Sequence, residues 1–374
     1  MRVVHVVPPA EPPWTGVLAV IVRLSCALAA QGHDVTVWRF DRWEAAIYSE
    51  MRQQMQDAGV ASLRLPSTAR RTLRRAVTEA SLDTDVVVLH SVFLPSNVLI
   101  ARSVAVPYVL TPHGGYAPRS MARSRLRKRI WMAVLERRML HHASTVAALT
   151  DHEAADILRV APDSYVDVIP NGVDPAPEVP PAQVAELRSR TGLLALSAGR
   201  LDVLHKGLDH LVRALADAPE WRLVFVGPDH RGGRHELERL AHDLGVGDRI
   251  DIVDVVPRTE LHAWYEVADL FVLASRWEGM PLALLEALAH GTPALVSPVV
   301  DRLVPVARAG AGWVASPSDL APTLRHAAAL SPHDRGRLRP AARALAARYS
   351  WDAVATLAAD AYRRAVESSG TPSR

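Results

Sequence analysis

Short, almost wholly apolar runs alternate with longer segments of helical periodicity along the first half of the chain. Apolar runs of this length are typical of strands buried on both faces of a parallel sheet, with helices covering those faces. The predicted strands are 3–7, 35–38, 85–90, 108–111 and 145–149, and the first predicted helix is 16–31. This pattern predicts an α/β domain with a doubly wound parallel sheet.

A second alternation of the same kind follows a proline-rich stretch at residues 170–181, which is interpreted as an extended linker. Its predicted strands are 194–197, 223–226, 250–253, 270–274 and 294–297, and its predicted helices are 207–218, 236–244, 260–267 and 282–290. A length of 374 residues also favours two domains over one large core. We therefore expect two Rossmann-like domains facing each other across a cleft. The first spans 1–170 and is completed by a C-terminal helix at about 351–368, and the second spans 171–350.

Composition excludes several classes of protein. With 49% hydrophobic and 22% charged residues, the chain is neither collagenous nor disordered. A single cysteine, Cys26, cannot form an intramolecular disulfide, and no Cys/His spacing resembles a zinc site. The apolar run at 3–7 is too short for a secretory signal, and the stretch 14–30 is interrupted by Arg23 and too short to span a membrane. These features predict a cytoplasmic protein.

The positive charges are unevenly distributed. The chain has 43 Lys+Arg against 40 Asp+Glu, and lysine occurs only at Lys128 and Lys206. Residues 64–138 hold 14 cations and four acids, although the net charge of the whole chain is +3. Within that window, a predicted helix carries basic residues on one side (Arg70, Arg71, Arg74 and Arg75) and apolar residues on the other (Leu73, Ala76, Val77 and Ala80).

Two interpretations of this basic helix remain open. It could rest on anionic lipid as a peripheral contact with the inner membrane face. It could equally be a solvated helix whose apolar side packs on its own sheet. Nucleic acid is not an expected partner, because residues 64–138 lack aromatic residues interleaved with the basic ones and lack any known nucleic-acid-binding motif.

Two glutamates follow the predicted strand 270–274, at the sheet edge where α/β folds bind ligands. Pro281 suits the first helical position, and the free amides of that helical turn, with the helix dipole, would form an anion site. Glu278 and Glu286 would then lie about 10 Å apart, which suits two carboxylates that bind different hydroxyl groups of one ligand. The alternative is that Glu278 only stabilises the helix N-terminus.

Two further strand ends carry candidate ligand groups. Arg200 and Lys206 follow the strand 194–197 and could clamp a diphosphate, although either cation could simply be solvated. His113 follows the strand 108–111 and precedes two glycines. A neutral imidazole there could bond a sugar hydroxyl or assist proton transfer, and the alternative is a loop histidine without a role.

The loop 8–16 is a further candidate, because the amides at Gly16 begin a helix and could contact an anion or an acceptor. No G-x-G-x-x-G fingerprint is present, so a nicotinamide or flavin cofactor is not expected. No D-x-D pair follows a strand, which argues against a metal-bound diphosphate.

Taken in order, these segments resemble the retaining glycosyltransferases of family 4, which have the GT-B fold. The resemblance covers most of the chain. Besides the opening strand and its glycine loop, it rests on Gly32-His33-Asp34-Val35, Ile169-Pro170-Asn171-Gly172-Val173-Asp174, Gly199-Arg200-Leu201, Lys206-Gly207, Glu278 and Glu286 at the E-x7-E spacing, and Gly291-Thr292-Pro293. It implies a hexosyltransferase that moves a sugar from a UDP- or GDP-sugar to a hydroxyl of a glycan, a lipid-linked acceptor or a specialised metabolite. It also implies front-side attack with retention, no metal ion, and no cofactor besides the nucleotide sugar.

The resemblance assigns roles residue by residue. Arg200 and Lys206 would hold the donor diphosphate, Glu286 the ribose, and Glu278 the hydroxyls of the transferred sugar. His113 would contact that sugar and, with Glu278, Arg200 and Lys206, complete the catalytic set. The other expected donor contacts are Gly16, Val256, Gly279, Met280, Pro281 and Leu282, and the expected acceptor contacts are Thr15, Gly16 and His113.

The first loop departs from the family pattern, because many members have two adjacent glycines where this chain has Trp14-Thr15-Gly16. Two other functions also remain open: a nucleotide-sugar epimerase of the same fold, and a non-catalytic GT-B partner subunit. The intact set of Arg200, Lys206, Glu278 and Glu286 argues against the partner subunit.

Overall fold

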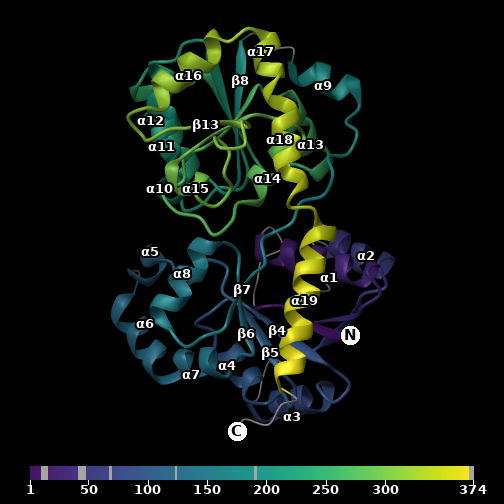
Figure 1. The fold of residues 1–374 in the computed structure, drawn as a ribbon. Coiled ribbons are helices and arrows are strands. Elements are labelled where there is room, and N and C mark those ends of the chain that lie inside the picture. The colour runs from purple at the N-terminus through teal and green to yellow at the C-terminus, as the bar shows by residue number, and fades with distance from the viewer. Residues whose placement is uncertain (10–15, 41–47, 67–69, 123, 189–191, 370–374) are drawn as a thin grey trace. The chain divides into compact units, whose positions relative to one another are not determined.

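The chain divides into two compact units (Figure 1). The computed structural model describes residues 1–9, 16–40, 48–66, 70–122, 124–188 and 192–369. Unit 1 comprises Met1–Gly172 and Trp351–Arg374, and unit 2 comprises Val173–Ser350. The chain passes from unit 1 to unit 2 inside the stretch 170–181 that the sequence marks as a linker.

Unit 1 is built on a seven-stranded sheet with the order β3-β2-β1-β4-β5-β6-β7, and all of its ladders are parallel. Its strands are β1 (Arg2–Val6), β2 (Asp34–Arg39), β3 (Ala61–Arg64), β4 (Val86–His90), β5 (Tyr108–Thr111), β6 (Thr145–Ala148) and β7 (Val166–Val168). The five predicted strands are confirmed to within a residue or two at their ends. The two edge strands were missed, because β3 is exposed along its whole length and β7 has only three residues.

Helices surround this sheet. They are α1 (Gly16–Ala30), α2 (Ser49–Asp57), α3 (Arg70–Ala80), α4 (Pro95–Ala101), α5 (Pro118–Ala122), α6 (Arg125–Trp131), the π-helical segment η2 (Met132–Glu136), α7 (Arg137–His142), α8 (Asp151–Val160) and the C-terminal α19 (Trp351–Ser369). α19 lies beside α1 although more than 300 residues separate them in the sequence (Figure 1). The Gln31 amide, just after α1, donates to the carbonyl and the carboxylate of Asp352 at 2.8 and 2.9 Å.

Unit 2 has a six-stranded parallel sheet with the order β10-β9-β8-β11-β12-β13. Its strands are β8 (Leu193–Ala198), β9 (Trp221–Val226), β10 (Ile250–Val253), β11 (Leu270–Leu273), β12 (Ala294–Val296) and β13 (Gly312–Val314). Its helices are α9 (Pro181–Arg188), α10 (Val203–Lys206), α11 (Leu208–Ala216), α12 (Gly233–Asp243), the short 3-10 helix η3 (Gly247–Arg249), α13 (Arg258–Val267), α14 (Leu282–Ala289), α15 (Pro298–Asp301), α16 (Leu320–Ala329), α17 (Pro332–Gly336) and α18 (Leu338–Ala347). The predicted strands and helices are again present, and the short strand β13 was missed.

Each sheet reverses its strand order once, between β1 and β4 in unit 1 and between β8 and β11 in unit 2. Doubly wound sheets bind ligands outside the carboxyl ends of the strands at such a reversal, because the connections run in opposite directions on its two sides and leave a crevice. The predicted site residues are therefore expected at these two places.

Candidate functional site

The loops that follow β8 and β11 come together at the reversal of the unit 2 sheet. Gly207 makes this approach possible: its φ is +64°, and a Cβ at that position would lie 2.1 Å from the carbonyl oxygen of Ala274. A residue with a side chain would meet both the clash and the strain of left-handed backbone. The close approach places Lys206, from the first loop, against Glu278, from the second.

Lys206 and Glu278 form a largely buried ion pair. The Lys206 ammonium donates to Oε1 of Glu278 at 2.7 Å, and the Ser275 hydroxyl donates to the same oxygen at 2.6 Å. The two charged side chains are only 16% and 8% exposed. Burial, the largest single influence, pushes the pKa of Glu278 upward, but the charges of Lys206 and His205 and the hydrogen bonds from Lys206 and Ser275 together outweigh it, and the net pKa is lowered. Glu278 is therefore ionised at neutral pH.

Neighbouring side chains hold this loop in place. The His205 ring stacks on Trp277 with centroids 4.6 Å apart, and its Nε2 donates to the Trp277 carbonyl at 2.8 Å. Arg276 makes two bonds to the carboxylate of Asp209, at 2.8 and 2.7 Å. Sequence reasoning missed these contacts, and their one sequence signal is that Arg276 and Trp277 directly precede Glu278.

Glu286 has a separate set of partners. It lies on the second turn of α14, where the Tyr265 hydroxyl donates to Oε2 at 3.0 Å and Arg258 lies 3.1 Å from Oε1. Burial and the Glu286 charge raise the pKa of Tyr265 well above its ordinary value, so its hydroxyl remains a donor. Both partners belong to α13, which the sequence did not connect with Glu286.

The start of α14 differs from the prediction in one respect. Pro281 is the N-cap residue, with φ −77° and ψ 113°, and the helix begins at Leu282. The expectation that Pro281 is the first helical residue is therefore wrong by one position, because its ψ lies in the extended region. Pro281 has no side-chain group that could cap this N-terminus, so within the described parts of the chain the first amides of α14 have no capping side chain.

The other predicted residues of unit 2 lie in the loops that follow β8, β10 and β11 and at the start of α14. Arg200 is exposed at the end of β8, and Val256 is half-buried between β10 and α13. Gly279 and Leu282 are half-buried, whereas Met280 and Pro281 are buried.

In unit 1, His113 lies two residues beyond β5 in strained backbone. Its φ is +52°, a region that residues other than glycine rarely adopt. The next residue, Gly114, donates its N–H to the buried carboxylate of Glu153 on α8, which fixes the loop. Burial lowers the pKa of His113 to about 4, so its ring is neutral at pH 7. Nε2 of His113 lies 2.9 Å from Nδ1 of His90, the last residue of β4.

The first loop of unit 1 is described only in part. Gly16 is the first residue of α1 and is exposed. Thr15, the other predicted acceptor contact from this loop, lies outside the described residues.

The basic window, residues 64–138, contains two helical segments with different surfaces. On α3, Leu73 and Val77 are buried and the four arginines are exposed, so the apolar side of this helix packs on its own domain. On α6 and η2, Leu126, Ile130 and Val134 recur every four residues and are 73%, 59% and 63% exposed. That apolar stripe was missed, although its spacing is visible in the sequence. Among the described residues, no helix is both long enough and apolar enough to cross a membrane.

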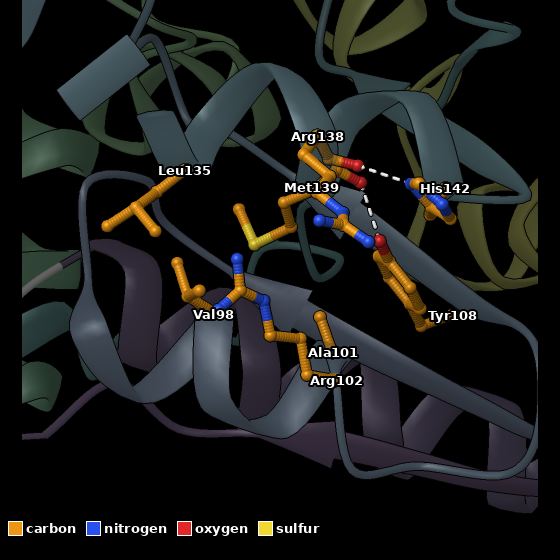
Figure 2. Close-up of a pocket in the computed structure, with 8 residues that line it drawn as sticks. All are labelled: Val98, Ala101, Arg102, Tyr108, Leu135, Arg138, Met139 and His142. Carbon is orange, nitrogen blue, oxygen red and sulfur yellow. Dashed lines mark hydrogen bonds between the residues drawn. The ribbon is translucent and has the colours of Figure 1, made fainter. Parts of the chain in front are cut away.

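A cavity of about 390 Å³ adjoins this region of unit 1 (Figure 2). Val98, Leu135 and Met139 contribute apolar walls, and Figure 2 shows the guanidinium groups of Arg102 and Arg138 extending toward the same space. The cavity thus combines two positive charges with an apolar lining.

Comparison with known proteins identifies the class of this fold. The structure of HepE from Anabaena in complex with UDP and glucose superposes on the chain with a TM-score of 0.78 at 16% identity, and covers 96% of this chain and 98% of that one. The protein therefore has the GT-B fold, as expected. Residues 182–343 match the family model for glycosyl transferases group 1, and residues 15–172 match the glycosyl transferase 4-like domain. The chain belongs to glycosyltransferase family 4, and the resemblance read from its motifs is confirmed.

Two curated relatives illustrate the range of the family. The D-inositol 3-phosphate glycosyltransferase of Xylanimonas cellulosilytica is 35% identical over 252 residues, which cover 62% of this chain and 60% of that protein. The GDP-mannose:cellobiosyl-diphosphopolyprenol alpha-mannosyltransferase of Xanthomonas campestris is 27% identical over 383 residues, which cover 100% of this chain and 98% of that protein. The acceptors named for the two relatives are different.

Proposed function

We propose that the protein is a retaining glycosyltransferase that transfers a sugar from a UDP- or GDP-sugar to a hydroxyl of a glycan, lipid-linked or small-molecule acceptor, without a metal ion. The observation that carries this proposal is the Lys206–Glu278 pair at the sheet reversal of unit 2. It combines a cation suited to a diphosphate with a carboxylate that stays ionised and can accept bonds from sugar hydroxyls.

The surroundings of the pair support the same chemistry. A departing nucleoside diphosphate carries negative charge, which Lys206, the nearby Arg200 and the uncapped amides of α14 would stabilise. Preorganised donors of this kind act most strongly where charge develops, so no strong base is required of the protein. Glu286, held by Tyr265 and Arg258, would accept bonds from the ribose hydroxyls.

Donor binding tests this proposal directly. We expect calorimetry with UDP, GDP, UDP-glucose and GDP-mannose to detect binding of at least one nucleotide, and Lys206→Ala to weaken it at least tenfold. Glu286→Ala should weaken the same nucleotide. The matched control is Lys128→Ala, the other lysine of the chain, which lies on α6 of unit 1 and donates to the Ser120 carbonyl. Wild-type affinity in both Lys206→Ala and Glu286→Ala would refute the donor site.

The reaction class needs a second measurement. Incubation of the bound nucleotide sugar with and without candidate acceptors, followed by NMR of the product anomer, should give an acceptor-dependent product that keeps the donor's anomeric configuration. Glu278→Gln should lower the rate of this transfer more than it lowers donor affinity. Acceptor-independent formation of an epimer would instead identify a nucleotide-sugar epimerase, and an inverted anomer would refute retention.

We also propose that unit 1 makes a peripheral contact with an anionic membrane through the stripe formed by Leu126, Ile130 and Val134. Residues 125–142 carry six Arg and Lys residues, and their one acid, Glu136, is buried. Exposed apolar side chains flanked by cations are the pattern of a helix that lies in a membrane interface. Each such cation adds about 1 kcal/mol near an anionic surface.

Sedimentation with vesicles of phosphatidylglycerol and phosphatidylcholine tests this contact. We expect binding at low salt that weakens as salt rises, and loss of binding when Leu126 and Ile130 are both changed to Ser. The control is Leu82→Ser, because Leu82 is also 69% exposed but lies outside the stripe. No binding at low salt, or an equal loss in the control, would refute the contact.

A further inference from the structure

Three histidines form a continuous hydrogen-bonded chain at the sheet reversal of unit 1. His5 lies on β1, His90 ends β4, and His113 follows β5, so three neighbouring strands contribute one ring each. Nδ1 of His5 is 3.0 Å from Nε2 of His90, and Nδ1 of His90 is 2.9 Å from Nε2 of His113. Successive rings stack at 5.3 and 5.2 Å between centroids.

The geometry allows only two arrangements of protons. A neutral imidazole has one N–H, and each contact between two ring nitrogens needs one N–H and one lone pair. If His90 carries its proton on Nδ1, then His5 and His113 must carry theirs on Nδ1 as well. If His90 carries it on Nε2, all three rings must be Nε2–H. The three rings therefore share one tautomer.

The inner end of the histidine chain, at His5, decides between the two arrangements. Nε2 of His5 is buried and has no hydrogen-bond partner among the described residues. In the Nε2–H arrangement it would be a buried N–H without an acceptor, whereas in the Nδ1–H arrangement it is an unused lone pair. Among backbone groups, orphaned buried N–H donors are rarer than acceptors with an unused lone pair, and the same cost at a ring nitrogen favours Nδ1–H throughout.

We propose that His5 and His90 are positioning residues that hold His113 as the neutral Nδ1–H tautomer. His113 then presents a hydrogen-bond donor to an oxygen of the bound sugar, and it cannot accept a proton at Nδ1 from an acceptor hydroxyl because that nitrogen is already protonated. Nδ1 of His113 makes no hydrogen bond to the described residues and is not among their buried polar atoms without a partner, so its N–H is open to a ligand. The role toward sugar rests on the proposed function, whereas the tautomer does not.

The strain at His113 is consistent with this role. A left-handed backbone at a residue with a side chain persists only where its surroundings enforce it, and such sites cluster where ligands bind. Here Glu153 holds the following amide and His90 holds the ring. Both restraints act on the orientation of one imidazole.

NMR of the full-length protein labelled with 15N-histidine tests the proposal without any ligand. Long-range 15N–1H correlations distinguish the two tautomers, and the variants of His5, His90 and His113 assign the signals. We expect all three rings to be Nδ1–H in the wild type. In His90→Asn the side-chain amide can replace the Nδ1–H donor, so His113 should remain Nδ1–H, whereas in His90→Leu both tautomers of His113 should appear.

The possible outcomes separate this inference from the proposed function. Nε2–H signals for the three rings in the wild type would overturn the proposed positioning role of His5 and His90. A single, unchanged His113 tautomer in His90→Leu would overturn it as well. The exposed His152, changed to Gln, is the control and should leave all three signals in place. A failure of the donor-binding test would refute the glycosyltransferase site while leaving the tautomer measurement intact.

Discussion

Mild acid should destabilise unit 1 through its three linked histidines. Burial lowers the pKa of His5 to about 3 and of His113 to about 4, and burial with the neighbouring His113 and His5 lowers the pKa of His90 well below its ordinary value. In the unfolded chain each ring titrates near its ordinary pKa of about 6.5. Between pH 6.5 and about 4 the unfolded chain therefore binds protons that the folded unit does not. The contribution of these three histidines to the free energy of unfolding is therefore present above pH 6.5 and is lost as the pH drops through this window.

The size of the effect follows from proton linkage. For one such histidine the free energy of unfolding falls by about 1.4 kcal/mol between pH 7.5 and pH 5.5. Three histidines together give a loss of about 4 kcal/mol, which is a large part of the 5–15 kcal/mol typical of a folded domain. Most carboxylates contribute little over this range, because their ordinary pKa values lie near 4. Burial raises the pKa of Glu136 and Glu153, so any proton that these two bind in the folded unit offsets part of the loss.

Hydrogen exchange measured by mass spectrometry in urea can follow the two units separately, which matters because a two-unit chain need not unfold in one step. Peptides from β1 and β4 should report the loss. His5→Leu should reduce the loss of free energy of unfolding between pH 7.5 and pH 5.5 by about 1.4 kcal/mol, whatever its effect on stability at neutral pH. His152→Leu is the exposed control. A loss below about 1 kcal/mol in the wild type, or the same pH dependence in His5→Leu, would refute the reasoning.

Two further predictions concern packing and burial. Gly207→Ala should destabilise unit 2 by well over the roughly 1–2 kcal/mol of left-handed strain, because its Cβ would lie 2.1 Å from the Ala274 carbonyl oxygen. Gly232→Ala is the control: its φ is +83° and its Cβ would meet nothing within 4 Å, so it should show the strain alone. Equal melting temperatures for the two variants would contradict the packing argument. Glu136→Gln should destabilise unit 1 by about 1–3 kcal/mol, because Oε2 accepts from the Trp131 indole at 2.7 Å and Oε1 from the Phe93 amide at 3.2 Å, and in either orientation the amide nitrogen of Gln would face one of these N–H groups. Unfolding in urea followed by tryptophan fluorescence checks this, and an unchanged midpoint would show that these bonds contribute nothing.

Much of the fold could be predicted because the buried strands of both sheets are continuous apolar runs. The predicted strand 108–111 matches β5 residue for residue, since turn residues bound it on both sides. The missed strands lie at or near sheet edges, where a strand needs fewer apolar residues. The apolar face of α3 was visible in the sequence, but only the structure shows that Leu73 and Val77 pack on the domain.

The candidate site was predictable only in part. Position after a strand identified Lys206, Glu278 and His113, because every strand in a parallel sheet ends at the same edge. Which loops meet depends on strand order, so the pairing of Lys206 with Glu278 required the structure. His5 and His90 were read as parts of apolar strands, although a histidine inside such a run is a signal that could have been followed.

The return of the chain to unit 1 has a consequence for how the protein is made. α19 buries Trp351, Val354, Ala355, Ala358, Ala359, Ala361, Tyr362 and Ala365, and Tyr362 meets the His5 ring edge-on at 6.1 Å. During synthesis, the ribosome completes all of unit 2 before it releases the helix that covers the first strands. Unit 2 can therefore fold as a contiguous segment while the earlier-made part of unit 1 still exposes apolar surface. Such an order would be the reverse of the usual N-terminal-first course of folding on the ribosome.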